Sequence, residues 1–184
     1  MPSSKPAPDF LHWYTPLHER FMKYCAGQTM GLESAEDIAQ DAILSALEQW
    51  DRLEEKQRLL PYMIGIVNNR VRNQLRSAKV QQRYLEARKR QLTNRLPDRP
   101  ELALDLHYLL RAIDRLPGLS KEALLLTAVS GFSIREVADI QNSTEGAVKT
   151  RISRARKQLR DTFDENGKPL SINERLHIYA SILL

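Results

Sequence analysis

A basic segment in the last quarter of the chain has the residue types and spacing that most clearly indicate a chemistry. No acidic residue occurs between positions 146 and 160. The basic side chains there are Lys149, Arg151, Arg154, Arg156, Lys157 and Arg160. Apolar residues recur among them at helical steps of four, three and four, at Val148, Ile152, Ala155 and Leu159. A helix buried on one side and positive elsewhere suits nucleic acid, because its outer face can enter a major groove while its flanks meet phosphates.

The residues before this helix predict a helix-turn-helix. Ser133 and Glu136 have the spacing of a capping box for a short helix that ends near Ile140. Gln141, Asn142 and Ser143 follow as a tight turn, and Thr144 is expected to cap the basic helix. Upstream, we expect helices over about 101–116 and from a Ser120 cap to Ser130, with Pro117-Gly118 and Gly131 in the turns.

The front half contains a second helix with an informative surface. Ser34, with Asp37 three positions on, resembles a capping box, and apolar residues then repeat at helical spacing as far as Trp50. The opposite face is polar and acidic, at Asp37, Gln40, Asp41 and Glu48. An earlier amphipathic helix is expected from about Phe10 to Ala26, ending near Gly27.

A third helix is expected over residues 61–79, after a polar connection at 51–60. Pro61 suits its first turn, and Ile64, Val67, Val71 and Leu75 form its packing stripe. Arg70, Arg72, Arg76 and Lys79 are basic, and Asn69 and Asn73 share one face a turn apart. Three asparagines inside one helix are locally unfavourable, which an exposed, solvated surface would also explain.

These elements divide the chain into two helical domains with flanking segments. We expect a disordered tail at 1–9, a first domain at 10–79, a flexible linker at 80–104 and a second domain at 105–163. The first part of the linker can extend the preceding helix, and the prolines of LPDRP then end it. Residues 164–184 are expected to be an amphipathic tail that docks on its own protein or on a partner.

Composition favours an all-α protein and excludes several function classes. Hydrophobic residues make up 42% of the 184, enough for folded cores, and glycines number only seven. The single cysteine and four scattered histidines provide no metal-ligand pattern and no disulfide framework, so we expect no metal and no cofactor. No nucleophile–base pair indicates an enzyme. No signal peptide and no membrane-length apolar run occurs, so we expect a cytoplasmic protein without membrane insertion.

Taken together, the motifs resemble those of bacterial sigma factors of the extracytoplasmic-function (ECF) class. The second domain resembles their fourth region at Leu116-Pro117, Gly131, Ser133, Glu136, Ala138, Gly146, Val148, Arg151 and Arg154-Ala155-Arg156. The stretch AEDIAQDAILSALEQW resembles the helix by which the class binds polymerase, and YMIGIVNNRVRNQLRS resembles its promoter-melting helix. The resemblance covers roughly residues 10–163. Tyr62, Val67 and Asn73 depart from the usual Trp, Ala and Asp, and residues 51–60 lack the expected Phe-Arg-Gly pattern.

The resemblance implies a role for each group of candidate residues. Asp37, Gln40, Asp41 and Glu48 would bind core RNA polymerase. Tyr62, Asn69, Arg70, Arg72, Asn73 and Arg76 would contact the minus-ten element. Thr144, Glu145, Lys149, Arg151, Arg154 and Arg156 would contact the minus-thirty-five element, with inward-lying arginines pairing inside the domain as the alternative. An anti-sigma factor is a further expected partner.

Two other function classes remain open at this point. A stand-alone helix-turn-helix regulator would place a ligand or phosphoacceptor domain in the front half, and no aspartate follows a predicted strand here. A protein that mimics a sigma factor to sequester its antagonist would need no basic reading helix, whereas this chain has one.

Overall fold

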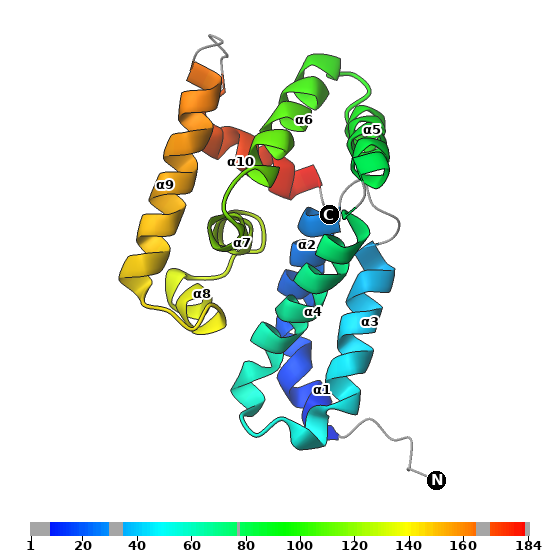
Figure 1. Cartoon of the computed structure of the whole chain (residues 1–184), viewed down its shortest axis with the longest axis vertical. Helices are drawn as coiled ribbons and strands as arrows, with labels where there is room; N and C mark the ends of the chain where they lie inside the picture. Colours follow the sequence, from blue (N-terminus) through cyan, green and yellow to red (C-terminus); the bar gives the residue numbers. More distant parts are fainter. Residues whose placement is uncertain (1–7, 30–34, 77, 165–169, 183–184) are drawn as a thin grey trace.

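The computed structural model describes residues 8–29, 35–76, 78–164 and 170–182, and all regular structure in them is helical, which confirms the all-α prediction. The helices are α1 (Pro8–Tyr14), α2 (His18–Thr29), α3 (Ala35–Glu48), α4 (Leu59–Gln74), α5 (Ala78–Arg95), α6 (Pro100–Asp114), α7 (Gly118–Ala128), α8 (Ile134–Ile140), α9 (Glu145–Asp164) and α10 (Ile172–Ile182). Short 3-10 turns lie at Thr15–Leu17, Trp50–Arg52 and Lys56–Arg58. Figure 1 shows α1–α4 as one bundle and α6–α9 as a second group beside it.

The first bundle packs α3 against both α2 and α4. Small residues on the inner face of α3, among them Ala39, Ala42 and Ala46, are almost fully buried and allow the helices to approach closely. The first predicted helix is broken by the 3-10 turn around Pro16, because proline lacks the N–H that a continuous helix requires there. The second half of that helix, α2, continues past Gly27 to Thr29.

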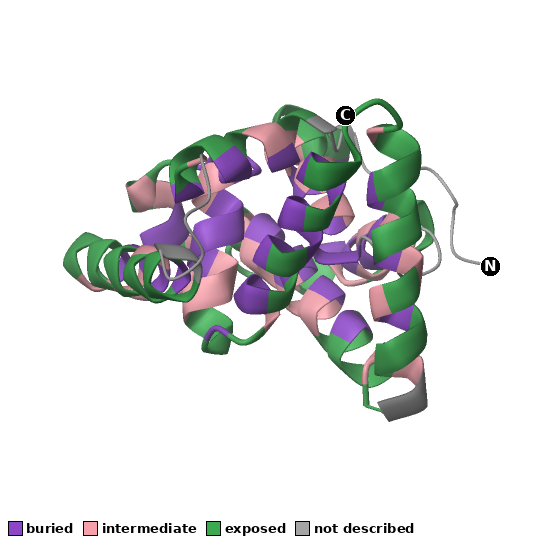
Figure 2. Ribbon diagram, turned by 90° about the horizontal axis from the view of Figure 1, so that it is seen from above, coloured by how far each residue is buried: buried purple, intermediate pink, exposed green. Residues whose placement is uncertain are grey.

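Both ends of the third predicted helix differ from the expected range of 61–79. The α4 helix begins at Leu59, with Pro61 in its first turn as predicted, but it ends at Gln74 rather than 79. The Ser34 cap lies outside the described residues. Figure 2 shows the buried residues of the helices facing one another across the interior of the molecule.

The helix-turn-helix consists of α8, a tight turn and α9. Ser133 caps α8 in the predicted capping box: its Oγ accepts the Glu136 N–H at 3.2 Å, while the Glu136 carboxylate accepts the Ser133 N–H at 2.8 Å. Asn142 lies in the turn at φ 45°, a left-handed conformation that asparagine tolerates better than most residues. Thr144 Oγ1 accepts the Ala147 N–H at 3.2 Å, so the predicted cap of the basic helix is also present.

The predicted buried stripe of α9 faces the second bundle. Val148, Ile152, Ala155 and Leu159 are all at most 7% exposed. One predicted cap in this bundle is wrong: α7 begins after Pro117, whose carbonyl accepts the N–H groups of Ser120 and Lys121, so Ser120 lies inside the first turn. Gly131, at φ 73°, ends the turn after α7, where a side chain would be strained.

The segment expected to be a linker is mostly helical. Residues 78–95 form α5, which packs along α6. Its buried face consists of Tyr84, Arg88 and Leu92, at successive helical turns. Arg88 Nη1 lies 2.8 Å from Asp114 Oδ2 of α6 and donates a hydrogen bond to the Tyr84 hydroxyl. This pairing attaches the segment to the second bundle, which begins at Pro100.

The C-terminal tail folds back on the same chain. Ile172, Leu176 and Tyr179 of α10 are buried against the second bundle, and Arg175 pairs with Asp105 of α6 at 2.5 Å. The tail was expected to dock either on its own protein or on a partner, and the structure shows it docked on its own chain. Within the described ranges, every helix is too short or too polar to cross a lipid bilayer.

Candidate functional site

The outward face of α3 presents the acidic candidates as one surface. Asp37, Gln40 and Glu48 are exposed, and Asp41 is partly exposed. Leu44 lies among them at helical spacing and is 57% exposed, a large apolar side chain in the middle of a charged face. An acidic rim around an exposed leucine is a composition typical of a protein-binding surface. The sequence analysis omitted Leu44, although its position between Gln40 and Glu48 on the helix was a usable signal.

The α4 helix places its candidates on one outward face. Helical spacing puts Tyr62, Asn69 and Asn73 in a single stripe of α4, with Arg70 and Arg72 on its two sides, while Arg76 lies in the turn just after the helix ends at Gln74. All of these except Tyr62, which is partly buried, are exposed. Amide and guanidinium groups on an open helical face can hydrogen-bond to base edges and phosphates.

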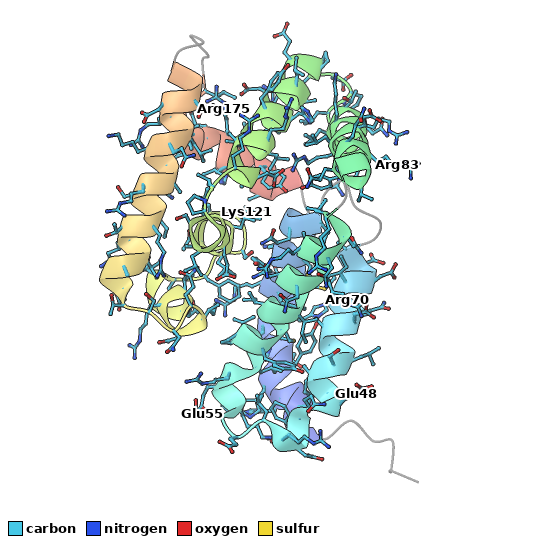
Figure 3. All side chains as sticks on the ribbon, in the orientation of Figure 1. Glu48, Glu55, Arg70, Arg83, Lys121 and Arg175 are labelled. Atoms are coloured by element: carbon cyan, nitrogen blue, oxygen red, sulfur yellow. The ribbon has the colours of Figure 1, made fainter. Side chains whose placement is uncertain are left out.

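The faces of α3 and α4 are adjacent and joined by an ion pair. Arg70 Nη2 of α4 lies 2.8 Å from Asp41 Oδ2 of α3, and both side chains are about half exposed. Figure 3 shows Arg70 on the side of α4 that faces α3. The structure therefore brings together two groups of residues that the sequence predicts for different partners.

Asn68 is a polar residue of α4 that the sequence analysis did not select. Its Oδ1 accepts from the Tyr24 hydroxyl at 2.7 Å, and its Nδ2 donates to Glu122 Oε2 of α7 at 2.5 Å. Asn68 therefore faces inward, toward α2 and the second bundle. Only Asn69 and Asn73 of the three asparagines are available at the surface.

The outward face of α9 differs in detail from the predicted set of contacts. Lys149, Thr150, Ser153, Arg154 and Lys157 are exposed on the side opposite the buried stripe. Thr150 and Ser153 were missed because, apart from the capping residue Thr144, only charged residues were selected, whereas the angular position of each residue on the helix would have identified them. Glu145 lies 3.7 Å from Lys149 at the start of the helix.

Two of the predicted arginines lie at the edge of the buried face. Arg151 Nη1 donates to Gln141 Oε1 at 2.7 Å, so its guanidinium pairs inside the domain, which was the stated alternative. Arg156 is partly buried, and its Nε is shielded from solvent. By contrast, Arg154 is exposed and can reach a phosphate.

Two parts of the chain match known protein families. Residues 13–80 match the family "Sigma-70 region 2", and residues 106–159 match "Sigma-70, region 4". The ECF RNA polymerase sigma factor EcfG of Rhodopseudomonas palustris is 30% identical over 129 residues, which cover 69% of this chain and 70% of the relative. The RNA polymerase sigma factor CarQ of Myxococcus xanthus is 31% identical over 136 residues, which cover 71% and 75%.

Two solved structures share the fold at lower identity. CnrH in complex with the cytosolic domain of CnrY superposes with a TM-score of 0.57 at 18% identity, covering 86% of this chain and 89% of that one. The sigma factor RpoE in complex with the anti-sigma factor NepR, from Bartonella quintana, superposes with a TM-score of 0.54 at 22% identity, covering 87% and 99%. The two matched regions and the relatives at 30% and 31% identity establish that this chain belongs to the sigma-70 family, as a member of its extracytoplasmic-function class.

Proposed function

We propose that this chain binds core RNA polymerase through α3 and directs it to promoters through α4 and α9. The observation that supports this function best is that one chain has three exposed helical faces, and the chemistry of each suits one of the three contacts that a sigma factor makes. One is acidic around Leu44, one has asparagines and arginines, and one is basic. A sigma factor needs a surface for each of its three contacts.

The α3 face fits a basic surface on the polymerase. Charge complementarity at Asp37, Asp41 and Glu48 would set the association rate and the register, and burial of Leu44 would add affinity. The open face of α4 would hold unstacked bases of the minus-ten element, with Asn69 donating to and accepting from a base edge. Arg72 and Arg76 would contact strand phosphates.

The outward face of α9 would enter the major groove at the minus-thirty-five element. Lys149, exposed near the helix N-terminus, would reach base edges, as residues at this position do in helix-turn-helix proteins. Arg154 and Lys157 would meet phosphates, which fix position without specifying sequence. We also propose that a protein antagonist regulates the chain, because the solved structure of similar fold from Bartonella quintana pairs a sigma factor with an anti-sigma factor.

The direct test is reconstitution with core polymerase. We expect the purified chain to co-elute with core and to support transcription from a subset of promoters on genomic DNA. Changing both Asp37 and Asp41 to lysine should abolish co-elution while helical content is unchanged. Asp51→Lys combined with Glu86→Lys changes the charge equally at exposed sites outside this face and should leave binding intact. Equal binding by both double variants would refute the assignment of α3.

A further inference from the structure

The two domains are held together by specific polar contacts. Arg20 Nη1 of α2 lies 2.8 Å from Glu136 Oε1 of α8, and its guanidinium lies 4.3 Å from the centre of the Phe132 ring. Burial alone would raise the pKa of Glu136, but hydrogen bonds from Ser133 and Arg20 outweigh it and lower that pKa. The same carboxylate therefore caps α8 and binds the first domain.

A second set of contacts runs from α2 to the basic helix. Gln28 and Tyr24 of α2 bond to Asn68 of α4, which donates to Glu122 of α7. Glu122 Oε1 also accepts from Gln141 Nε2 at 2.9 Å, and Gln141 accepts from Arg151 of α9 at 2.7 Å. Continuous hydrogen bonds thus connect the helix proposed to bind the minus-ten element with a predicted DNA-contacting arginine of α9.

The C-terminal helix α10 contacts both domains. Its start is fixed by a capping box of its own, in which Ser171 and Glu174 bond to each other's backbone N–H. Arg175, 2% exposed, pairs with Asp105, and Leu176 is also 2% exposed. The hydroxyl of the fully buried Tyr179 donates to the Gly27 carbonyl of α2 at 3.0 Å. Figure 1 shows α10 running from beside α9 to the end of α2.

This closed arrangement is too small to serve both promoter elements at once. The two elements are centred about 25 base pairs apart, which is about 85 Å at 3.4 Å per base pair. A compact chain of 184 residues has a radius of gyration of only about 16 Å. The α4 and α9 helices can therefore contact one promoter only after the two domains separate.

We propose that α10 is an internal clamp that keeps the two domains closed, and that its release opens the chain for polymerase and promoter. The proposal rests on the function proposed above for α4 and α9. It assigns a role to a helix that lies beyond both matched family regions, which end at residues 80 and 159. When α10 is packed on the second domain, its Tyr179 also bonds to Gly27 of α2, and so α10 links the two domains. Release of α10 from the second domain removes this link.

Energy transfer between dyes on full-length protein measures the clamp directly. Cysteines at exposed Gln57 and Gln158 place one dye on each domain. The natural Cys25 is buried, and burial raises its pKa to about 12, so it stays unlabelled. Leu176→Glu puts a charge at the buried face of α10, whereas the matched control His177→Glu puts it on the exposed face of the same helix.

We expect Leu176→Glu to lower energy transfer, in the absence of polymerase and DNA, and His177→Glu to leave it unchanged. In the presence of core polymerase, Leu176→Glu should bind promoter DNA about tenfold more tightly. Tyr179→Phe, which removes only the hydroxyl that reaches Gly27, should shift both quantities in the same direction by less. If Leu176→Glu loses helical content, Tyr179→Phe decides the test alone.

Energy transfer that stays at the wild-type value in the folded variants would overturn the clamp. That result is distinct from failure of the proposed function, because the free chain is measured without polymerase or promoter. Conversely, opening without any transcription in reconstitution would uphold the clamp and count against the proposed function.

Discussion

Arg70 of α4 and Asp41 of α3 form an ion pair of 2.8 Å, so the proposed DNA-binding and polymerase-binding surfaces share one contact. Both side chains are about half exposed, and such pairs contribute about 0–1 kcal/mol to stability. Their pairing therefore matters less for folding than for the availability of each charge to its partner. Polymerase that engages Asp41 would free Arg70 for a phosphate.

Exchanging the two charges separates these roles. Asp41→Arg combined with Arg70→Asp preserves the ion pair, so the free energy of unfolding should change by less than about 1 kcal/mol. Binding to core polymerase should nevertheless weaken strongly, because α3 then presents a cation. Denaturant unfolding and co-elution with core measure the two effects, and tight core binding by the exchanged variant would contradict the role of Asp41.

On the outward face of α9, substitution of a phosphate-contacting residue should affect DNA binding differently from substitution of a base-contacting residue. Arg154→Ala should weaken binding to all minus-thirty-five sequences alike and reduce the slope of log affinity against log salt by about 1, because one phosphate contact is lost. Lys149→Ala should instead reduce discrimination between promoter sequences. Titration of duplexes at several salt concentrations measures both, with Arg115→Ala on an exposed site outside the helix-turn-helix as the control.

Helix patterns and the two caps of the helix-turn-helix were features of this chain that could be predicted. The stripe from Val148 to Leu159 and the pair Ser133–Glu136 depend on spacing along one helix, which sequence records directly. Asn68 and Arg151 could not be placed in the same way. A polar side chain on a helix has the same local pattern whether it faces water or packs against other residues. Asn68 bonds to Tyr24 and Glu122, which are distant in sequence, and Arg151 bonds to Gln141 in the turn before α9.

The first part of residues 80–104 was expected to be helical, but the packed helix α5 that the segment forms was obscured for a related reason. The buried face of α5 has an arginine at its centre, between Tyr84 and Leu92, so a search for apolar spacing finds no stripe. Arg88 is tolerated inside only because Asp114 and the Tyr84 hydroxyl lie within hydrogen-bond distance. That partnership depends on the packing of α5 on α6, which local sequence does not record.

The buried pair at this position predicts an asymmetric response to mutation. Asp114 pairs with both Arg88 and Lys121, and Arg88 is 2% exposed. Asp114→Ala should lower the free energy of unfolding by about 3–5 kcal/mol, because it leaves a buried cation without its carboxylate. Lys121→Met should cost much less, since Asp114 keeps Arg88. Urea unfolding measures both variants. Equal decreases in the free energy of unfolding would contradict the inference that the buried Arg88 requires the Asp114 carboxylate.

Stability should also fall in mild acid because of His107 on α6. Burial, together with the nearby cations Arg88, Arg111 and Lys89, lowers the pKa of His107 from 6.5 to about 4. The folded state therefore keeps this imidazole neutral below pH 6.5, while the unfolded chain takes up a proton. The contribution is complete above pH 6.5 and is lost as the pH falls toward 4, by about 2–3 kcal/mol at pH 4.5.

Replacing the imidazole isolates this effect from the titration of carboxylates. His107→Leu should lose about 2–3 kcal/mol less than the natural chain between pH 7 and pH 4.5. His177→Gln, at an exposed histidine, should keep the full pH dependence. Urea unfolding at the two pH values measures all three proteins. Identical pH dependence in the His107→Leu variant and the natural chain would show that His107 is protonated equally in both states and would remove it as the source of acid sensitivity.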